Sequence, residues 1–152
     1  MFHNDHLLKS TNTDMLNVYF AVAANRVIVD SVSNQVSIID LYEQLRAPTF
    51  PVLVQKLTFL FYVSRDKTDP STHEVRLVCE IGDKAMVEAA VHLDFKNEDT
   101  TRIVIGLDNC TLPQAGVLKA KLMDKAVELG SLELTVEQVL GEALNADQAV
   151  RH

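Results

Sequence analysis

Apolar and polar residues alternate with a period of two along most of this chain, a pattern typical of β-strands that bury one face. The longest strict alternation covers residues 85–95, whose odd-numbered residues are all apolar and are predicted to face a core. Similar patterns predict strands over the segments 16–23, 26–30, 35–39, 51–63, 74–81 and 102–107. The residues expected to share one apolar face of their strand are Leu16, Val18, Phe20 and Val22 in the first, Leu53, Leu57, Phe59, Phe61 and Val63 in the fourth, and Val75, Leu77, Cys79 and Ile81 in the fifth. Turn formers such as Asp, Asn, Gly and Pro separate these segments, which favours short antiparallel connections.

Residues 117–129 fit both a helix and a strand, because good helix formers at helical spacing also alternate with lysines. We interpret the segment as a strand, with Gly130-Ser131 as the hairpin turn before another strand at 132–136. The apolar spacing then becomes helical after a capping-box arrangement. It predicts a short closing helix over 137–145.

Together these elements predict an all-β fold, a two-sheet antiparallel β-sandwich of about eight strands with a short C-terminal helix. A chain of 152 residues is long enough for one domain. We place that domain at 15–146, between a flexible polar N-terminal tail at 1–14 and a C-terminal tail at 147–152.

Charge and composition narrow the class of partner. The net charge is −7, with 14 Lys and Arg against 21 Asp and Glu, so nucleic-acid binding is not expected. The sequence has no secretory signal and no apolar run long enough to span a membrane, so a cytoplasmic location is expected. Cys79 and Cys110 are then expected to be reduced core thiols.

Acidic residues gather in two of the predicted turns. Asp66 and Asp69 lie in "RDKTDP", and Glu98 and Asp99 lie in "KNEDTT". Loop carboxylates that meet at one end of a sandwich can bind Ca²⁺, so these four are weak metal candidates, although solvated turn acids are the simpler interpretation. We find no catalytic constellation and no cofactor motif, and we interpret His73 and His92 as surface histidines.

The segment "SIIDLYEQLRAPTFP", residues 37–51, is a predicted corner between the sheets. Proline cannot donate a ladder hydrogen bond, so Pro48 and Pro51 belong at strand edges or starts. Phe50 is expected to plug the end of the sandwich. The alternative is a Pro-x-x-Pro ligand for an aromatic groove.

Two stretches carry a resemblance to a family of proteins. They are "NVYFAVAANRVIVDSVSNQVSIIDLYEQLRAPTFPVLVQKLTFLFYV" and "LPQAGVLKAKL…LGSLELTV". Over residues 16–136 the pattern resembles a family of small uncharacterised bacterial cytosolic β-sandwich proteins, a domain of unknown function. Val117-Leu118 departs from it, because such families usually carry an aromatic residue after the glycine. The resemblance implies a β-sandwich and supplies no catalytic residues.

The sequence therefore favours a non-enzymatic β-sandwich module that binds another macromolecule, with a protein partner or a homo-oligomer expected. One alternative is a Ca²⁺- or carbohydrate-binding sandwich that uses the acidic turns. A second is an enzyme whose site the sequence does not reveal.

Overall fold

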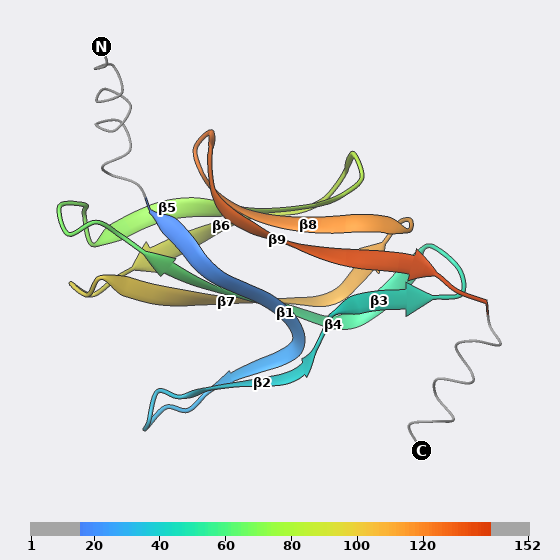
Figure 1. The fold of residues 1–152 in the computed structure, drawn as a ribbon, viewed down its shortest axis with the longest axis horizontal. Coiled ribbons are helices and arrows are strands. Elements are labelled where there is room, and N and C mark those ends of the chain that lie inside the picture. Colours follow the sequence, from blue (N-terminus) through green and yellow to red (C-terminus); the bar gives the residue numbers. More distant parts are fainter. Residues whose placement is uncertain (1–15, 141–152) are drawn as a thin grey trace, which may run out of the picture.

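A computed structural model describes residues 16–140 as nine β-strands in two sheets packed face to face (Figure 1). The strands are β1 (Asn17–Val29), β2 (Val36–Leu41), β3 (Gln44–Ala47), β4 (Val52–Ser64), β5 (Thr72–Ile81), β6 (Lys84–Asp94), β7 (Thr100–Leu112), β8 (Gly116–Asp124) and β9 (Val127–Gln138). The all-β fold and the two sheets are confirmed.

One sheet has four strands in the order β2-β1-β4-β7, and the other has five in the order β3-β9-β8-β5-β6. Neighbouring strands are antiparallel, except that β3 pairs parallel to β9. β3 is the strand that the sequence did not predict. Its four residues are too few and too polar to show a pattern, and Leu45 and Ala47 find their places by pairing with Val136 and Gln138.

The inner faces of the sheets form one apolar core. β5 follows its predicted alternation, with Val75, Leu77, Cys79 and Ile81 all buried. In the 85–95 segment Leu93 and Phe95 are also buried. The prediction for that segment is wrong at Ala85, which is exposed, because a register shift opposite Cys79 turns Met86 toward the core instead. Each fully buried Leu or Phe contributes about 1.5–3 kcal/mol, so this core dominates the stability.

The side of β4 and β7 that faces the core changes partway along both strands. On β4, the odd-numbered residue Leu57 lies in the core, whereas nearer the start of the strand the even-numbered residue Val54 packs against the core. On β7, Asn109 has a positive φ of 56°, and the next residue, Cys110, faces the core. Leu53, predicted to be inside, is consequently 54% exposed.

A β-bulge changes the predicted faces of β1. Val18 lies opposite Val63 and Phe20 lies opposite Tyr62, so Tyr19 is an extra residue without a partner on β4. Leu16 and Val18 face the core as predicted, but after the bulge the inward side passes to the alanines that follow. The prediction that Phe20 shares a face with Leu16 and Val18 is therefore wrong.

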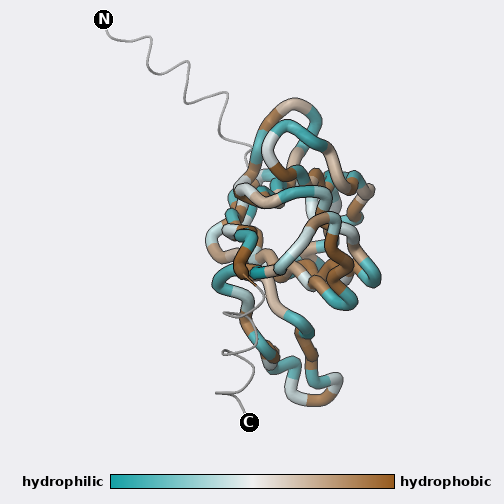
Figure 2. Tube along the Cα trace, turned by 90° about the vertical axis from the view of Figure 1, so that its right-hand side faces the viewer, coloured by the Kyte–Doolittle hydropathy of each residue, from teal (hydrophilic) through white to brown (hydrophobic). Residues whose placement is uncertain are grey.

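β1 is longer than its pairing with β4, and its second half leaves the sandwich. Residues 17–24 pair with β4, whereas residues 24–29 pair with β2. The hairpin of residues 26–39, here named the arm, projects beyond the two packed sheets in both views (Figures 1 and 2).

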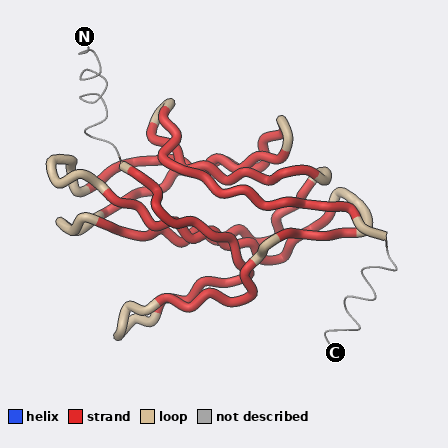
Figure 3. Tube along the Cα trace, viewed as in Figure 1, coloured by secondary structure: helices blue, strands red, loops and turns tan. Residues whose placement is uncertain are grey.

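The end of the chain differs from the prediction in two ways (Figure 3). Residues 117–129 are strand as interpreted, but the hairpin turns at Lys125, with φ of 56°, and not at Gly130-Ser131. The prediction of a C-terminal helix that begins at residue 137 is wrong. β9 continues to Gln138, and the Val139 N–H then donates to the Ala47 carbonyl at 3.0 Å. Residues 141–145, and the predicted tails 1–14 and 147–152, lie outside the described residues.

The corner at residues 37–51 is confirmed. The chain leaves the four-stranded sheet after β2, forms β3 in the five-stranded sheet, and returns through a cis Phe50–Pro51 bond to β4. Phe50 is half-buried and packs against the core, as expected of a plug.

The tight contact between Gly130 of β9 and Val18 of β1 predicts a sharp difference between two glycines. A Cβ on Gly130 would lie 2.4 Å from the Cβ of Val18, whereas a Cβ on Gly106 would lie 3.7 Å from Thr58 Oγ1. We expect Gly130→Ala to lower the free energy of unfolding by about 1–3 kcal/mol through overpacking. Gly106→Ala is the control and should be neutral or slightly stabilising. Urea denaturation of both variants measures this, and equal effects would contradict the packing of β1 against β9.

Candidate functional site: an aromatic groove beneath the arm

The outer face of the five-stranded sheet is charged and internally paired. Its ion pairs are Glu74–His92, Arg76–Glu88, Glu80–Lys121 at 3.3 Å and Lys119–Glu128 at 3.6 Å. The hydrogen bond with Glu74 raises the pKa of His92 above its ordinary value. Cross-strand pairs of opposite charge stabilise a solvated sheet surface, so this face needs no partner.

The outer face of the four-stranded sheet carries a cluster of apolar side chains. Phe20 and Tyr62 lie opposite each other on β1 and β4, and Phe20 is 45% exposed. Leu60 lies two residues before Tyr62 on the same face of β4. It is fully buried although it points away from the core. The arm covers Leu60, because Val36 and Ile38 of β2 line the same hollow.

Local hydrogen bonds fold the tip of the arm. The Asp30 carboxylate accepts the N–H groups of Val32 and Ser33, each at 2.8 Å, and these bonds lower the pKa of Asp30. The Asn34 N–H donates to the Asp30 carbonyl at 2.8 Å, and Asn34 adopts a positive φ of 63°. Asn and Asp tolerate such turn conformations better than other residues, so the sequence itself specifies this turn.

A groove of about 490 Å³ lies between the arm and the sheet. It is lined by Tyr19, Phe20, Val36, Ile38, Leu60 and Tyr62. The Tyr62 ring centroid lies 5.9 Å from that of Tyr19 and 5.6 Å from that of Phe20, so three aromatic rings form one wall. Its size is typical of sites that accept small ligands or peptide side chains.

A polar cleft of about 420 Å³ adjoins this groove and shares Tyr19 and Tyr62 with it. Arg102 of β7 lines the cleft and donates from Nη2 to the side-chain oxygen of Asn34, and at 3.4 Å to the Asn34 carbonyl. This contact ties the tip of the arm to the far side of the sheet. The groove therefore offers aromatic surface along its wall and hydrogen-bonding groups at one end.

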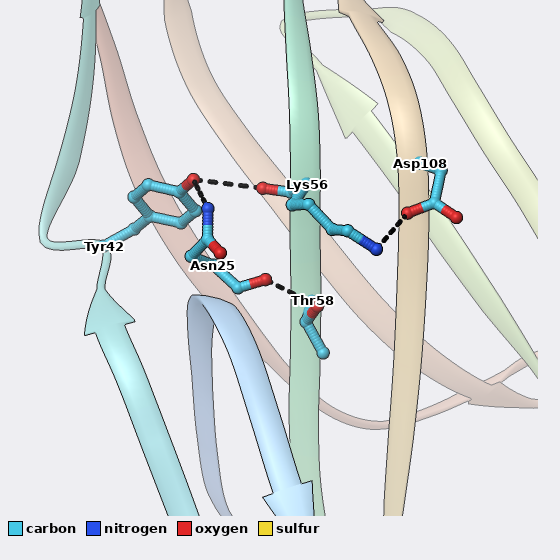
Figure 4. Close-up of polar contacts among 5 residues, drawn as sticks. All are labelled: Asn25, Tyr42, Lys56, Thr58 and Asp108. Atoms are coloured by element: carbon cyan, nitrogen blue, oxygen red, sulfur yellow. Dashed lines mark hydrogen bonds and ion pairs between the residues drawn. The ribbon is translucent and has the colours of Figure 1, made fainter.

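A polar network braces the base of the arm (Figure 4). The Tyr42 hydroxyl donates to the Lys56 carbonyl at 3.0 Å, and the Asn25 amide lies 3.5 Å from the Tyr42 oxygen. Thr58 Oγ1 donates to the Asn25 carbonyl at 3.1 Å. Lys56 pairs with Asp108 at 3.1 Å. The hydrogen bonds join the two residues at the base of the arm, Asn25 and Tyr42, to β4, and the ion pair joins β4 to β7. An open cleft of about 680 Å³ lies beside this network.

The structure brings the two acidic turns together, but around a basic residue. The Arg65 N–H donates to the Asp99 carbonyl at 2.9 Å, and Arg65 Nε donates to the Glu98 carbonyl at 2.8 Å. Asp69 is buried and accepts the Asp66 N–H at 3.1 Å. Within residues 16–140 no group of three or more His, Cys, Asp or Glu side chains is placed to hold a metal ion. Sequence reasoning paired these turns but missed the role of Arg65.

Both cysteines are free and buried in the core. Burial raises the pKa of the Cys79 thiol to about 12 and also raises that of Cys110. A nucleophilic cysteine needs a lowered pKa and access to solvent, so neither thiol has the environment of a catalytic group.

One feature of the sequence could have predicted the groove, namely strand segments that are apolar on both faces. Tyr19-Phe20 and Leu60-Phe61-Tyr62 are apolar on both faces of their strands. A strand in a two-layer sandwich can bury only one face in the core, so the second apolar face needs a cover or a ligand.

Topology and core define this protein as a two-sheet β-sandwich whose described residues include no helix able to cross a membrane. The chain belongs to a family of unknown function, DUF6941, whose model matches residues 19–137. This confirms the resemblance to a domain of unknown function.

Solved structures similar to this chain come from proteins of different kinds. An immunoglobulin-like protein from Pseudomonas aeruginosa shares 13% identity at a TM-score of 0.43, over 82% of this chain and 98% of that chain. A β-glucosidase from Listeria innocua, in complex with glucose, shares 6% identity at a TM-score of 0.42, over 80% of this chain and 17% of that chain. No curated protein matches the sequence. We transfer no functional residue from these structures.

Calcium binding by the acidic turns stays a prediction from the sequence, and a thermal melt tests it. Lys67 lies 4.0 Å from Asp99, and Arg65 lies between the turns, so positive charge already fills this region. We expect the melting temperature to change by less than about 1 °C on adding CaCl₂ or EDTA, since a ligand stabilises only the state that it binds. A saturable rise that Asp99→Asn removes would establish a calcium site.

Thiol labelling tests the burial of the cysteines. Because their pKa values are raised, both thiols should stay protonated and unreactive toward Ellman's reagent in the native protein at about pH 8. After denaturation without reductant, both of its two cysteines should react as free thiols. Rapid labelling of the native protein, or fewer than two thiols after denaturation, would contradict this account of the core.

Proposed function

We propose that this protein is a non-enzymatic interaction module that binds an extended apolar segment of another protein in the groove beneath the arm. The observation that carries the proposal is the aromatic wall of Tyr19, Phe20 and Tyr62 on an outer sheet face. Apolar surface with a polar rim is typical of protein interaction sites. The opposite outer face, with its paired charges, offers no comparable surface.

The shape of the groove favours an extended segment over a globular surface. Val36 and Ile38 of the arm form one side of the groove and Leu60 and Tyr62 of the sheet form the other, and an extended segment would fit between them. Aliphatic or aromatic side chains would contact the three rings, and aromatic contacts add about 0.5–1.5 kcal/mol beyond their buried area. Arg102 and Asn34 at the polar end could then bond to main-chain groups of the bound segment.

The cysteines and the acidic turns support a role without catalysis, in a reducing compartment. Cys79 and Cys110 are inert by burial, and the carboxylates of the acidic turns lie beside Arg65 and Lys67. Free thiols are typical of proteins in the cytosol, and we propose that the protein acts in the cytosol of a bacterium.

Selection from a phage library of random linear peptides tests the proposal. We expect the wild-type protein to select peptides rich in apolar and aromatic residues. Phe20→Ser removes one ring from the groove wall. It should raise the Kd of the selected peptides about tenfold or more, which corresponds to about 1.4 kcal/mol of binding free energy. Tyr19→Ser should act in the same direction.

Leu53→Ser is the matched control, because Leu53 is an exposed apolar residue at the opposite end of β4. This variant should bind the selected peptides as tightly as the wild type. Circular dichroism and melting curves establish that all three variants are folded. Failure to select any peptide, or peptides that bind equally to the Phe20 and Leu53 variants, would contradict the proposal.

A further inference from the structure

Arg102 lies at the polar end of the groove, half-buried, with a positive charge that no carboxylate neutralises within residues 16–140. Its hydrogen bonds run from Nη2 to the carbonyl and the side-chain oxygen of Asn34, and both acceptors are neutral. Arg76, in contrast, pairs with the Glu88 carboxylate. A guanidinium stays protonated at all ordinary pH values, so Arg102 keeps its attraction for an anion.

The strand register places Arg102 in line with the aromatic wall. Tyr62 pairs with Phe20 on one side and with Arg102 on the other. Directly paired residues share a face of the sheet, so the two rings and the guanidinium form a row across β1, β4 and β7. Neighbouring strands lie about 4.8 Å apart, so a ligand on the rings is within reach of the guanidinium.

Both walls of the groove lead toward the contact between Arg102 and Asn34. On the sheet the wall runs from Leu60 to Tyr62, the strand partner of Arg102, and on the arm it runs from Ile38 toward Asn34. The contact joins the sheet to the tip of the arm at this end. An extended chain that lies along the groove meets this contact end on, so we expect the chain to stop there.

The other charged residues that line the cleft are Lys96, Asp94 and Glu98. Asp94 Oδ1 accepts the Lys96 N–H at 2.9 Å within its own turn, and Glu98 belongs to the turn before β7. Arg102 is the charged group of the cleft that lies beside the rings, because Tyr62 is its strand partner. A ligand on the rings therefore meets a positive charge first.

We propose that the groove binds the C-terminal segment of another protein, with apolar side chains on the rings and the free α-carboxylate on Arg102. This proposal rests on the function proposed for the groove and names the partner's chemistry. Hydrogen bonds between a guanidinium and a carboxylate are charge-assisted and about twice as strong as neutral ones, so a carboxylate is a better acceptor than the Asn34 oxygens. Capture of a C-terminal carboxylate is a recurring mode of peptide recognition. A chain terminus also meets the requirement that the segment stop at this end.

Fluorescence polarisation with matched synthetic peptides tests the proposal. The probes are peptides selected from a random library displayed with a free C-terminus, each labelled at its N-terminus and synthesised as the free acid and as the C-terminal amide. We expect the amide to bind the wild-type protein with a Kd about tenfold higher or more, because it lacks the negative charge.

Two variants assign the difference to Arg102. Arg102→Gln should raise the Kd of the acid about tenfold and leave that of the amide within about twofold, so that the two forms bind alike. The variant also loses its contact with Asn34, and binding of the amide reports whether the groove is intact. Arg76→Gln removes the same charge on the outer face of the five-stranded sheet and should keep the preference for the acid. Melting curves establish that both variants are folded.

Equal binding of acid and amide by the wild type would overturn the terminal carboxylate and leave the groove proposal standing. The same equality with an Asp or Glu recurring inside the selected peptides would assign Arg102 to a side-chain carboxylate instead. A preference for the acid that survives Arg102→Gln would also overturn the proposal. A wild-type protein that binds no peptide in either form would overturn both this proposal and the proposed function of the groove.

Discussion

A two-layer sandwich has four sheet faces and can bury only two of them, and this constraint underlies the rest of the structure. The two inner faces form the core around Phe59, Phe61 and Leu77. The outer face of the five-stranded sheet is compatible with water because its charges are paired across neighbouring strands. The outer face of the four-stranded sheet carries aromatic side chains instead, and the fold covers this apolar surface only in part.

The arm covers part of this apolar outer face. Its strand β2 covers Leu60, the contact between Arg102 and Asn34 holds its tip, and the network around Tyr42 holds its base. An isolated two-stranded hairpin is only marginally stable in water, so the arm depends on these contacts with the sandwich. The same contacts leave a groove open beneath it. Cover and binding site are therefore one structural device.

Sequence pattern was sufficient where a strand alternates strictly, and it predicted the fold class, the core of β5 and the corner at Phe50. It failed where one residue or one distant contact decides the outcome. The extra residue Tyr19 reversed the faces of β1, the short β3 exists only through its pairing with β9, and the β8–β9 turn lies at Lys125 and not at Gly130. The site was missed because groove residues come from three strands whose alignment depends on that bulge.

Photo-crosslinking in the native host tests most directly the claim that the outer face of the four-stranded sheet is the binding surface. p-Benzoylphenylalanine would replace Phe20 in one variant and Val117, on the opposite outer face, in another. We expect the Phe20 position to form a cross-link to a defined extended segment of another protein, mapped by mass spectrometry, and the Val117 position to form none. Cross-links from Val117 but not from Phe20, or the same cross-links from both, would contradict this account.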